Sequence, residues 1–260
     1  SQEWVRLDLT SSDFIMVARS IPKSYRNVTG RFASVKNRNP IGFESTLEKD
    51  FFLLLEFDRR VESFEEQPVT IPYHNPEGRL CRYTPDVLVR YRPEPTGQPG
   101  GPPALCEVKY RGDLREHGAE YRPKFTAARR YARDRGWRFR VVTEREIRTP
   151  RLGNIRFLLR YRPMRVDDTD RDALLTALRA HGTATPDALL ALARLNPLRH
   201  AEALATLWHL VATGQIGVDL DRLLTPYSVL RARTDGGDGG ARRPANPGLV
   251  DAGEDEDGPR

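Results

Sequence analysis

The chain has 260 residues, enough for one or two domains with a proper hydrophobic core. Its 42 Lys and Arg residues outnumber its 36 Asp and Glu residues, and no signal peptide or membrane-length apolar run is visible, so we expect a soluble cytoplasmic protein rather than a secreted or membrane protein. The two cysteines, Cys81 and Cys106, lack Cys-x-x-Cys spacing, which argues against a disulfide framework and a zinc site and predicts buried free thiols.

The positive charge is concentrated in one segment of the chain. Residues 111–165 contain 17 basic and 6 acidic residues, whereas residues 1–110 contain 15 of each. Residues 166–226 contain 5 basic and 8 acidic residues, and residues 227–260 contain 5 and 7. Because neutralisation of phosphates supplies most of the affinity of a protein for DNA, the basic segment predicts a DNA-binding surface. An Arg-rich solvated surface is the alternative.

The first 57 residues predict a basic arm followed by a helix. Residues 1–43 are expected to form a loop-rich arm whose Lys, Arg, Ser, Thr and Asn residues suit phosphate contacts or are simply solvated. Residues 44–57 predict a helix, with an apolar stripe at helical spacing. The stripe consists of Leu47, Phe51, Leu54 and Leu55. Glu48 lies beside the stripe, where a carboxylate is costly unless it is paired or bound to a cation; an exposed helix charge is the equal alternative.

The next stretch predicts strands. Residues 61–83 are expected to form a hairpin around a turn at His74–Gly78, with His74 at the surface. The hairpin leads into a strand that opens with Thr84-Pro85-Asp86 and continues through an apolar run. A Gly- and Pro-rich loop at residues 97–103 then leads to a further strand over residues 104–109.

These last two strands carry the candidate catalytic residues. Because side chains two apart on a strand share a face, Glu107 and Lys109 are expected to point together, while Val108 points into the core. Mg²⁺ takes oxygen ligands, so we expect Asp86 and Glu107 to bind it, with the Val108 carbonyl as an extra ligand and Mn²⁺ as a substitute. Glu48 would bind the same or a second metal, and the Lys109 ammonium would orient the attacking water. A strand-end Asp and a surface Glu–Lys pair are the alternative interpretation of so short a pattern.

The rest of the first domain, residues 1–165, predicts an α/β core. Residues 116–135 predict a basic helix that Pro123 interrupts or starts. Residues 137–143 alternate apolar and basic side chains, as a half-buried strand does, and residues 155–161 suit a strand or a short helix. This order of elements predicts a mixed sheet with the candidate catalytic residues meeting at one edge.

Residues 166–226 predict a small second domain. A capping-box-like Thr169-x-x-Asp172 starts a first helix that Gly182 ends, and Thr185-Pro186 starts a second. Asn196-Pro197 starts a third helix, which stops at Gly214 before a short strand over residues 215–220. Three short helices and a strand resemble a winged helix. Because the segment is acidic, we favour protein docking over DNA reading, and we expect residues 227–260 to be disordered.

At this point the chain resembles the TnsA family, the endonuclease subunit of heteromeric cut-and-paste transposons. The resemblance covers about residues 20–165. It rests on Thr29-Gly30-Arg31 with Ser34 and Lys36, on Glu44–Asp50, on Thr84-Pro85-Asp86, on Glu107-Val108-Lys109, and on Trp137 with Thr143–Ile147. The family implies a restriction-endonuclease-like PD-(D/E)xK fold with site residues matching Glu48, Asp86 and Lys109. Some members carry Gln where this chain has Glu107.

The resemblance also implies a function and partners. A TnsA-like subunit would nick the 5′ ends of a transposon in the bacterial cytoplasm, nucleoid-associated when bound to DNA. A separate DDE-type transposase, TnsB, would cut and join the 3′ ends, and the C-terminal region would engage the AAA+ ATPase regulator TnsC. Two alternatives stay open: a stand-alone defence or repair nuclease with the same core, and a non-catalytic DNA-binding scaffold.

Overall fold

A four-stranded mixed sheet forms the centre of the computed structural model, which describes residues 28–94, 98, 100–195 and 197–233. The strands lie in the order β3-β6-β7-β8. Their bounds are β3 Val61–Glu66, β6 Val87–Tyr91, β7 Ala104–Val108 and β8 Arg138–Val142. The pairs β3–β6 and β6–β7 are antiparallel, whereas β7–β8 is parallel. The expected α/β core with a mixed sheet is therefore confirmed.

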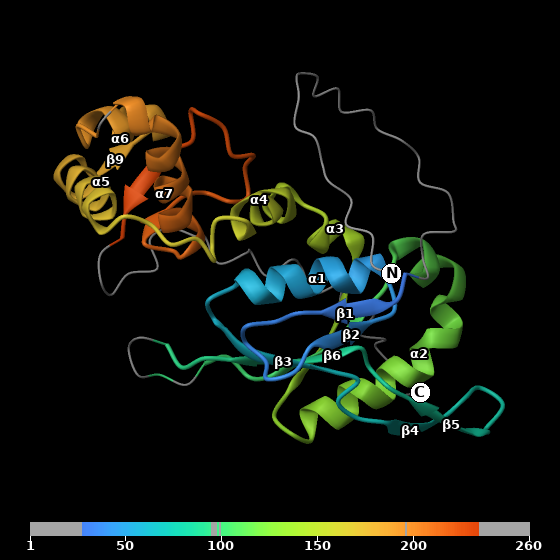
Figure 1. Cartoon of the computed structure of the whole chain (residues 1–260). Helices are drawn as coiled ribbons and strands as arrows, with labels where there is room; N and C mark the ends of the chain where they lie inside the picture. Colours follow the sequence, from blue (N-terminus) through green and yellow to red (C-terminus); the bar gives the residue numbers. More distant parts are fainter. Residues whose placement is uncertain (1–27, 95–97, 99, 196, 234–260) are drawn as a thin grey trace, which may run out of the picture.

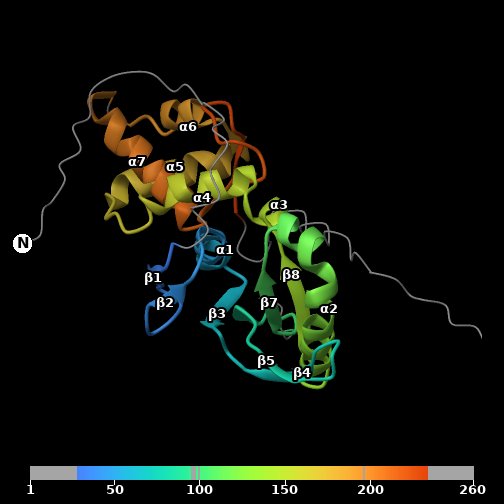
Figure 2. The ribbon, with the colours of Figure 1, turned by 90° about the vertical axis from the view of Figure 1, so that its right-hand side faces the viewer.

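Two helices cover the two faces of this sheet, α1 (Thr46–Phe57) on one and α2 (Arg111–Arg133) on the other (Figures 1 and 2). Because successive strand residues face opposite sides, Val87 packs in the cluster that contains the apolar side of α1, while Leu88 packs with Phe125 of α2. Each such side chain stabilises the fold by roughly 1.5–3 kcal/mol on burial. The helix expected over residues 44–57 is confirmed, with Ser45 as its N-cap.

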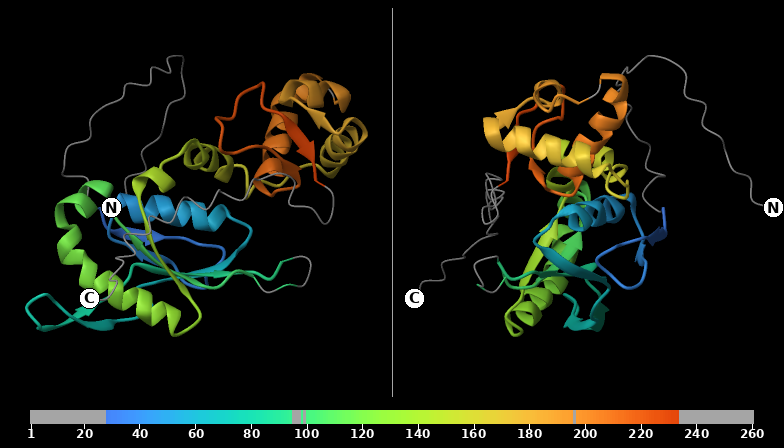
Figure 3. Two further views of the ribbon diagram at one scale, coloured as in Figure 1. Left: turned by 180° about the vertical axis from the view of Figure 1, so that it is seen from behind. Right: turned by 60° about the vertical axis from the view of Figure 1, so that its left-hand side comes forward.

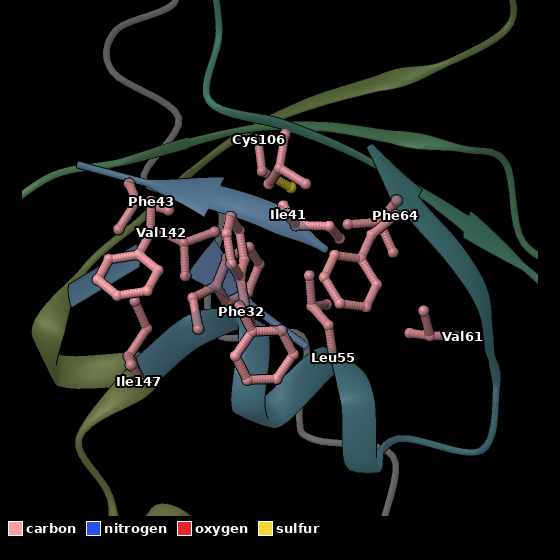
Figure 4. Close-up of a cluster of buried hydrophobic side chains, with 14 of the residues drawn as sticks. Phe32, Ile41, Phe43, Leu55, Val61, Phe64, Cys106, Val142 and Ile147 are labelled. Carbon is pink, nitrogen blue, oxygen red and sulfur yellow. The ribbon is translucent and has the colours of Figure 1, made fainter. Parts of the chain in front are cut away.

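A small hairpin, β1 (Gly30–Phe32) and β2 (Ile41–Phe43), replaces part of the loop-rich arm expected over residues 1–43. Figure 4 shows its side chains Phe32, Ile41 and Phe43 in the same apolar cluster as Leu55 of α1. Strands of three residues are too short to leave an alternating pattern, so tertiary burial decides them. Residues 1–27 of the expected arm lie outside the described residues.

The loop after β1 is attached to the end of α1 through Lys36. Its Nζ donates to the carbonyl of Leu55 at 2.7 Å and also to the carbonyl of Asp58. The last carbonyls of a helix have no partner within the helix, so this side chain satisfies two of them. Burial lowers the pKa of Lys36 to about 8, although the charges of Asp58 and Glu56 oppose the shift.

We expect Lys36→Met to destabilise the protein by about 1–2 kcal/mol in urea unfolding, because it removes the ammonium donor from the Leu55 carbonyl and leaves the Asp58 carbonyl with only the Val61 N–H. Lys49→Met, which removes an exposed Lys from helix α1, should cost less than about 0.5 kcal/mol. The folded pKa of Lys36 is lowered, so the unfolded chain binds more protons between about pH 8 and pH 10.5. The free energy of unfolding of the wild type should therefore rise with pH across that window relative to that of Lys36→Met. If Lys36 is solvated instead, the difference between the two proteins should not change with pH.

The predicted hairpin before Asp86 is confirmed as β4 (Ile71–His74) and β5 (Leu80–Tyr83), a separate two-stranded sheet. Gly78 has φ +75 in its turn, a conformation that favours glycine. His74 is exposed, as expected. The strand β3, which we expected within the same hairpin, pairs instead with β6 of the central sheet.

Helix α2 starts at Arg111, five residues before the expected residue 116. Its non-helical residue is His117, with φ −117, and Pro123 lies within the helix, so Pro123 neither starts nor interrupts it. The strand expected over residues 137–143 is confirmed as β8. Of the two alternatives for residues 155–161, the helix is correct: α3 (Glu144–Ile147) and α4 (Pro150–Leu159) follow β8.

The C-terminal part combines short helices with a second sheet. Its helices are α5 Asp168–His181, α6 Pro186–Leu192, the 3₁₀ helix η2 Pro197–Arg199 and α7 His200–Ala212. Its strands are β9 Thr183–Ala184, β10 Ile216–Gly217 and β11 Leu230–Ala232, in the order β10-β11-β9. Gly182 and Gly214 end their helices as expected, with φ +77 and +71.

Three expectations for this part are wrong in detail. The N-cap of α5 is Asp167, whose carboxylate accepts from the N–H groups of Thr169 and Asp170, so the helix starts before the expected capping box. The strand expected over residues 215–220 has only two residues. Strand β11 lies within residues 227–260, where we expected disorder. Its Leu230 is fully buried in the apolar core of the C-terminal helices, and this burial outweighs the polar character of the residues around it. Thr185 caps α6 as expected, while Asn196 lies outside the described residues.

Helix α4 joins the two parts of the chain (Figures 1 and 3). Leu158 belongs to the apolar core of the C-terminal helices, although it precedes the boundary expected at residue 165. The buried side chain of Asn154 donates to the carbonyls of Leu220 and Arg222 at 2.8 and 2.7 Å. The segment between β10 and β11 is therefore attached to α4. Across the described ranges, no helix combines the length and apolarity that a membrane crossing requires.

Candidate active site

Asp86 immediately precedes β6, at the end of the central sheet where β6 begins and the antiparallel β7 finishes. Its Oδ2 accepts a hydrogen bond from the backbone N–H of Val108 at 2.6 Å, and its carbonyl accepts from the N–H of Gln67 at 2.9 Å. The register that pairs Val87 with Cys106 sets Asp86 beside Glu107. The end of β7 and the start of β6 thus hold the carboxylate between them.

Glu107 and Lys109 point together, as the strand period predicts. The Lys109 Nζ lies 3.0 Å from the Glu107 Oε1, and the Glu107 side chain is 2% exposed. The other oxygen, Oε2, accepts a hydrogen bond from the hydroxyl of Tyr83 at 2.7 Å. A buried carboxylate is tolerated only when it is paired and hydrogen-bonded, and here both oxygens have partners.

The charges of these groups influence one another. Burial, reinforced by the charge of Glu107, raises the pKa of Asp86 to about 8, against the opposing effects of Lys109 and the Val108 N–H. Burial acts to lower the pKa of Lys109, but the carboxylates of Glu107 and Asp86 outweigh it and the pKa is raised. Lys109 is therefore a cation at neutral pH. A further positive charge nearby would lower the pKa of the Asp86 carboxyl and so favour its ionised form.

Glu48 has a structural explanation as well as a place near Asp86. Its N–H donates to the Ser45 hydroxyl oxygen at 3.1 Å, and that hydroxyl donates to the Glu48 carboxylate at 2.7 Å. The carboxylate also accepts from the N–H of Glu44 at 2.9 Å. This reciprocal cap accounts for an acidic residue in the first turn of α1. Its negative charge nevertheless contributes to the raised pKa of Asp86.

A cleft of about 420 Å³ opens beside Asp86. Glu48 and Asp86 line it, together with Glu44, Glu66 and Gln67. Gln67 has a positive φ of 43, which is uncommon for a residue other than glycine. The lining does not include Glu107 and Lys109, whose contacts are on the α2 side of the sheet. Asp86 is therefore the residue that links the cleft to the Glu107–Lys109 pair.

Sequence patterns did not identify two residues that contact Glu107. Tyr83 ends β5, and Lys124 lies in α2 with its Nζ 3.9 Å from the Glu107 Oε1. Neither lies near Glu107 in the chain, and neither belongs to a short motif. Only the packing of β5 and α2 against β7 brings them together.

The donor set suits a hard cation without forming a complete cage. Within the described residues, no three Asp, Glu, His or Cys side chains are arranged as a metal-binding group. Mg²⁺ usually takes one or two carboxylates and completes its shell with water and substrate oxygens, so such a group is not required. Burial and the charge of Glu107 raise the pKa of the Asp86 carboxyl, and a bound cation would stabilise its ionised form. The residues present therefore fit Mg²⁺.

The free thiols and the basic segment also have places in the structure. Cys106 is buried, as expected, while Cys81 is only half-buried, and both are free. The basic residues of α2 are mostly on its solvent-exposed side. These exposed residues are Arg111, Arg115, Arg122, Arg129, Arg130 and Arg133. They form a positive surface on the outer side of α2, the helix whose inner side contacts Glu107 through Lys124.

Two family models match adjoining parts of the chain. One, described as TnsA-like endonuclease N terminal, matches residues 58–144, and the other, described as TnsA endonuclease C terminal, matches residues 146–220. The first match contains Asp86, Glu107 and Lys109, whereas Glu48 lies before it. No curated protein matches the chain significantly.

Proposed function

The chain belongs to the TnsA endonuclease family, and on that premise we propose that it is the Mg²⁺-dependent subunit that cleaves the 5′ ends of a transposon. The observation that carries the proposal is the meeting of Asp86, Glu107 and Lys109 at one edge of the central sheet. The same arrangement supports a restriction-endonuclease-like fold of the PD-(D/E)xK type for this domain, over residues 1–165.

Each site residue has a role in this proposal. Asp86 and Glu107 would hold Mg²⁺, or Mn²⁺ in its place, with Glu48 from the cleft side and the Val108 carbonyl as further ligands. When bound, the cation activates water and offsets charge on the scissile phosphate. The Val108 N–H orients the Asp86 carboxylate through its 2.6 Å hydrogen bond. Lys109, a cation at neutral pH, would orient the attacking water and stabilise the charge that develops on the phosphate oxygens.

The exposed arginines of α2 would bind the phosphate backbone of the transposon ends. They carry no sequence information by themselves, because phosphate contacts position a duplex and base contacts identify it. A binding surface of this kind predicts an affinity that falls steeply with salt.

We assign partners to the remaining surface by its charge. The acidic residues 166–226 support a winged-helix-like docking domain for the AAA+ regulator TnsC, and three helices with a small antiparallel sheet agree with that shape. The DDE transposase TnsB would cut and join the 3′ ends. A reaction on transposon DNA would take place in the bacterial cytoplasm, at the nucleoid.

A plasmid that carries both transposon ends tests the proposed function. With the DDE partner and Mg²⁺, we expect strand breaks at the 5′ ends, mapped by primer extension, that disappear when EDTA removes the metal. Cutting of DNA without ends and without the partner would instead indicate a stand-alone defence or repair nuclease. DNA binding without any Mg²⁺-dependent break, with the partner present, would leave a non-catalytic scaffold and contradict the proposal.

A further inference from the structure

Lys124 differs from the other basic residues of α2 because it points into the protein. Its side chain is 18% exposed, and its Nζ lies 3.9 Å from the Glu107 Oε1. The ammonium also lies over three aromatic rings, with its Nζ 4.2 Å from the centroid of Tyr121, 5.1 Å from Tyr83 and 5.5 Å from Phe125. A cation over aromatic rings is held in place as well as attracted, so Lys124 is fixed beside Glu107.

Two lysines therefore share one carboxylate oxygen. The Lys109 Nζ is 3.0 Å and the Lys124 Nζ 3.9 Å from the same Glu107 Oε1, while the Tyr83 hydroxyl occupies Oε2. Tyr83 serves both ends of this arrangement, since its hydroxyl donates to Glu107 and its ring lies under Lys124. Glu107 thus has a second ammonium group close to the oxygen that Lys109 contacts.

We propose that Lys124 is a positioning residue that balances the buried charge of Glu107 when Lys109 leaves it to contact the attacking water or the scissile phosphate. This inference rests on the proposed function, because it assumes the role given there to Lys109. If Lys109 were the sole cationic side chain beside Glu107, its departure would leave a carboxylate that is 2% exposed with no charged side chain to balance it, and the bound cation alone would have to offset its charge. Lys124 and the Tyr83 hydroxyl stay in place and offset part of that charge.

The test is a double-mutant cycle between Lys124 and Glu107 in the full-length chain. Lys124→Met keeps the length of the side chain over the rings and removes its charge, and Glu107→Gln removes the charge that Lys124 balances. We expect Lys124→Met to lower the melting temperature by about 3–6 °C when Glu107 is present and by less than about 1 °C when it is combined with Glu107→Gln. Lys124→Arg, which keeps the charge, should restore part of the loss.

Cleavage kinetics then separate positioning from DNA binding. With end DNA, the transposase partner and Mg²⁺, we expect Lys124→Met to lower kcat roughly 10- to 100-fold and to leave the DNA Kd within about twofold. The control is Arg130→Met, which removes an exposed charge from the same helix and should weaken DNA binding with little change in kcat.

The outcomes are distinct. Equal melting-temperature losses in both backgrounds, or a higher Kd with an unchanged kcat, would show that Lys124 only packs or binds DNA, and the inference would be overturned while the nuclease assignment stands. If the wild type itself does not cleave ends with its partner and Mg²⁺, the proposed function fails and the role for Lys109 fails with it. The melting-temperature cycle still decides in that case whether Lys124 and Glu107 are paired.

Discussion

Asp86→Asn is expected to lower the rate of end cleavage by about a thousandfold or more and at the same time to stabilise the protein. The amide oxygen of Asn can still accept the hydrogen bond from the Val108 N–H, so the local geometry of β6 and β7 is retained. The amide carries no charge, however, and cannot serve as a carboxylate ligand to a hard cation. Activity and stability are therefore expected to change in opposite directions.

The stabilisation has a defined pH dependence in the metal-free protein. Because burial and Glu107 raise the folded pKa of Asp86 to about 8, the folded state holds this proton more tightly than the unfolded state does. The contribution of Asp86 to stability is fully present below about pH 4 and is lost as the pH rises through about 8. Wild type and Asp86→Asn should therefore have similar stabilities at pH 4 and differ by on the order of 4–5 kcal/mol at pH 8.

Lys109→Met provides the contrasting variant. It should also abolish cleavage, but without the stabilisation expected for Asp86→Asn, because Glu107 keeps Tyr83 and Lys124 as partners and no buried carboxylate is neutralised. Glu62→Gln, the same acid-to-amide change at an exposed position of β3, is the matched control and should alter neither property. Cleavage by Asp86→Asn at the wild-type rate, with the fold verified by circular dichroism, would refute the site assignment.

The second large effect is expected at Asp50, which lies on α1 and is almost fully buried. Its carboxylate accepts from Arg148 at 3.1 Å and from Arg156, so one side chain connects α1 to the segment after α3 and to α4. Asp50→Ala removes the carboxylate from both guanidinium groups, although Arg148 keeps its hydrogen bond to the Thr46 hydroxyl. We expect a loss of about 2–3 kcal/mol in urea unfolding, because hydrogen bonds to a charged group are lost, while solvent screens the part-exposed guanidinium groups that remain.

Two further variants show whether charge is the cause. Asp168→Asn breaks an exposed pair with Arg171 and should cost less than about 1 kcal/mol, since solvent screens such pairs. Replacing Asp50, Arg148 and Arg156 together by apolar residues of similar length should recover much of the stability, because no guanidinium group is then left without its carboxylate and the site stays packed. A triple variant as unstable as Asp50→Ala would mean that packing rather than charge is lost.

Sequence patterns succeeded where the determining contacts are local. The helix expected over residues 44–57 follows from its apolar stripe, although the structure starts it at Thr46 after the Ser45 cap, and β8 follows from its alternation. The same reasoning failed for β1, β2 and β11, each three residues long, because strands of that length are decided by what buries them. It also misplaced the start of α5, where Asp167 offers a cap that the motif Thr169-x-x-Asp172 does not supply.

The sequence by itself determined that Glu107 and Lys109 share a face, because strand side chains repeat every two residues, and it pointed to Asp86 as the third member and to the family. Only the tertiary structure decided what surrounds them. The register of β6 against β7 brings Asp86 to the Val108 N–H, and the packing of β5 and α2 brings Tyr83 and Lys124 to Glu107. The physical reason is that periodicity is a property of neighbouring residues, whereas the partners of a buried charge come from whichever elements exclude water from it.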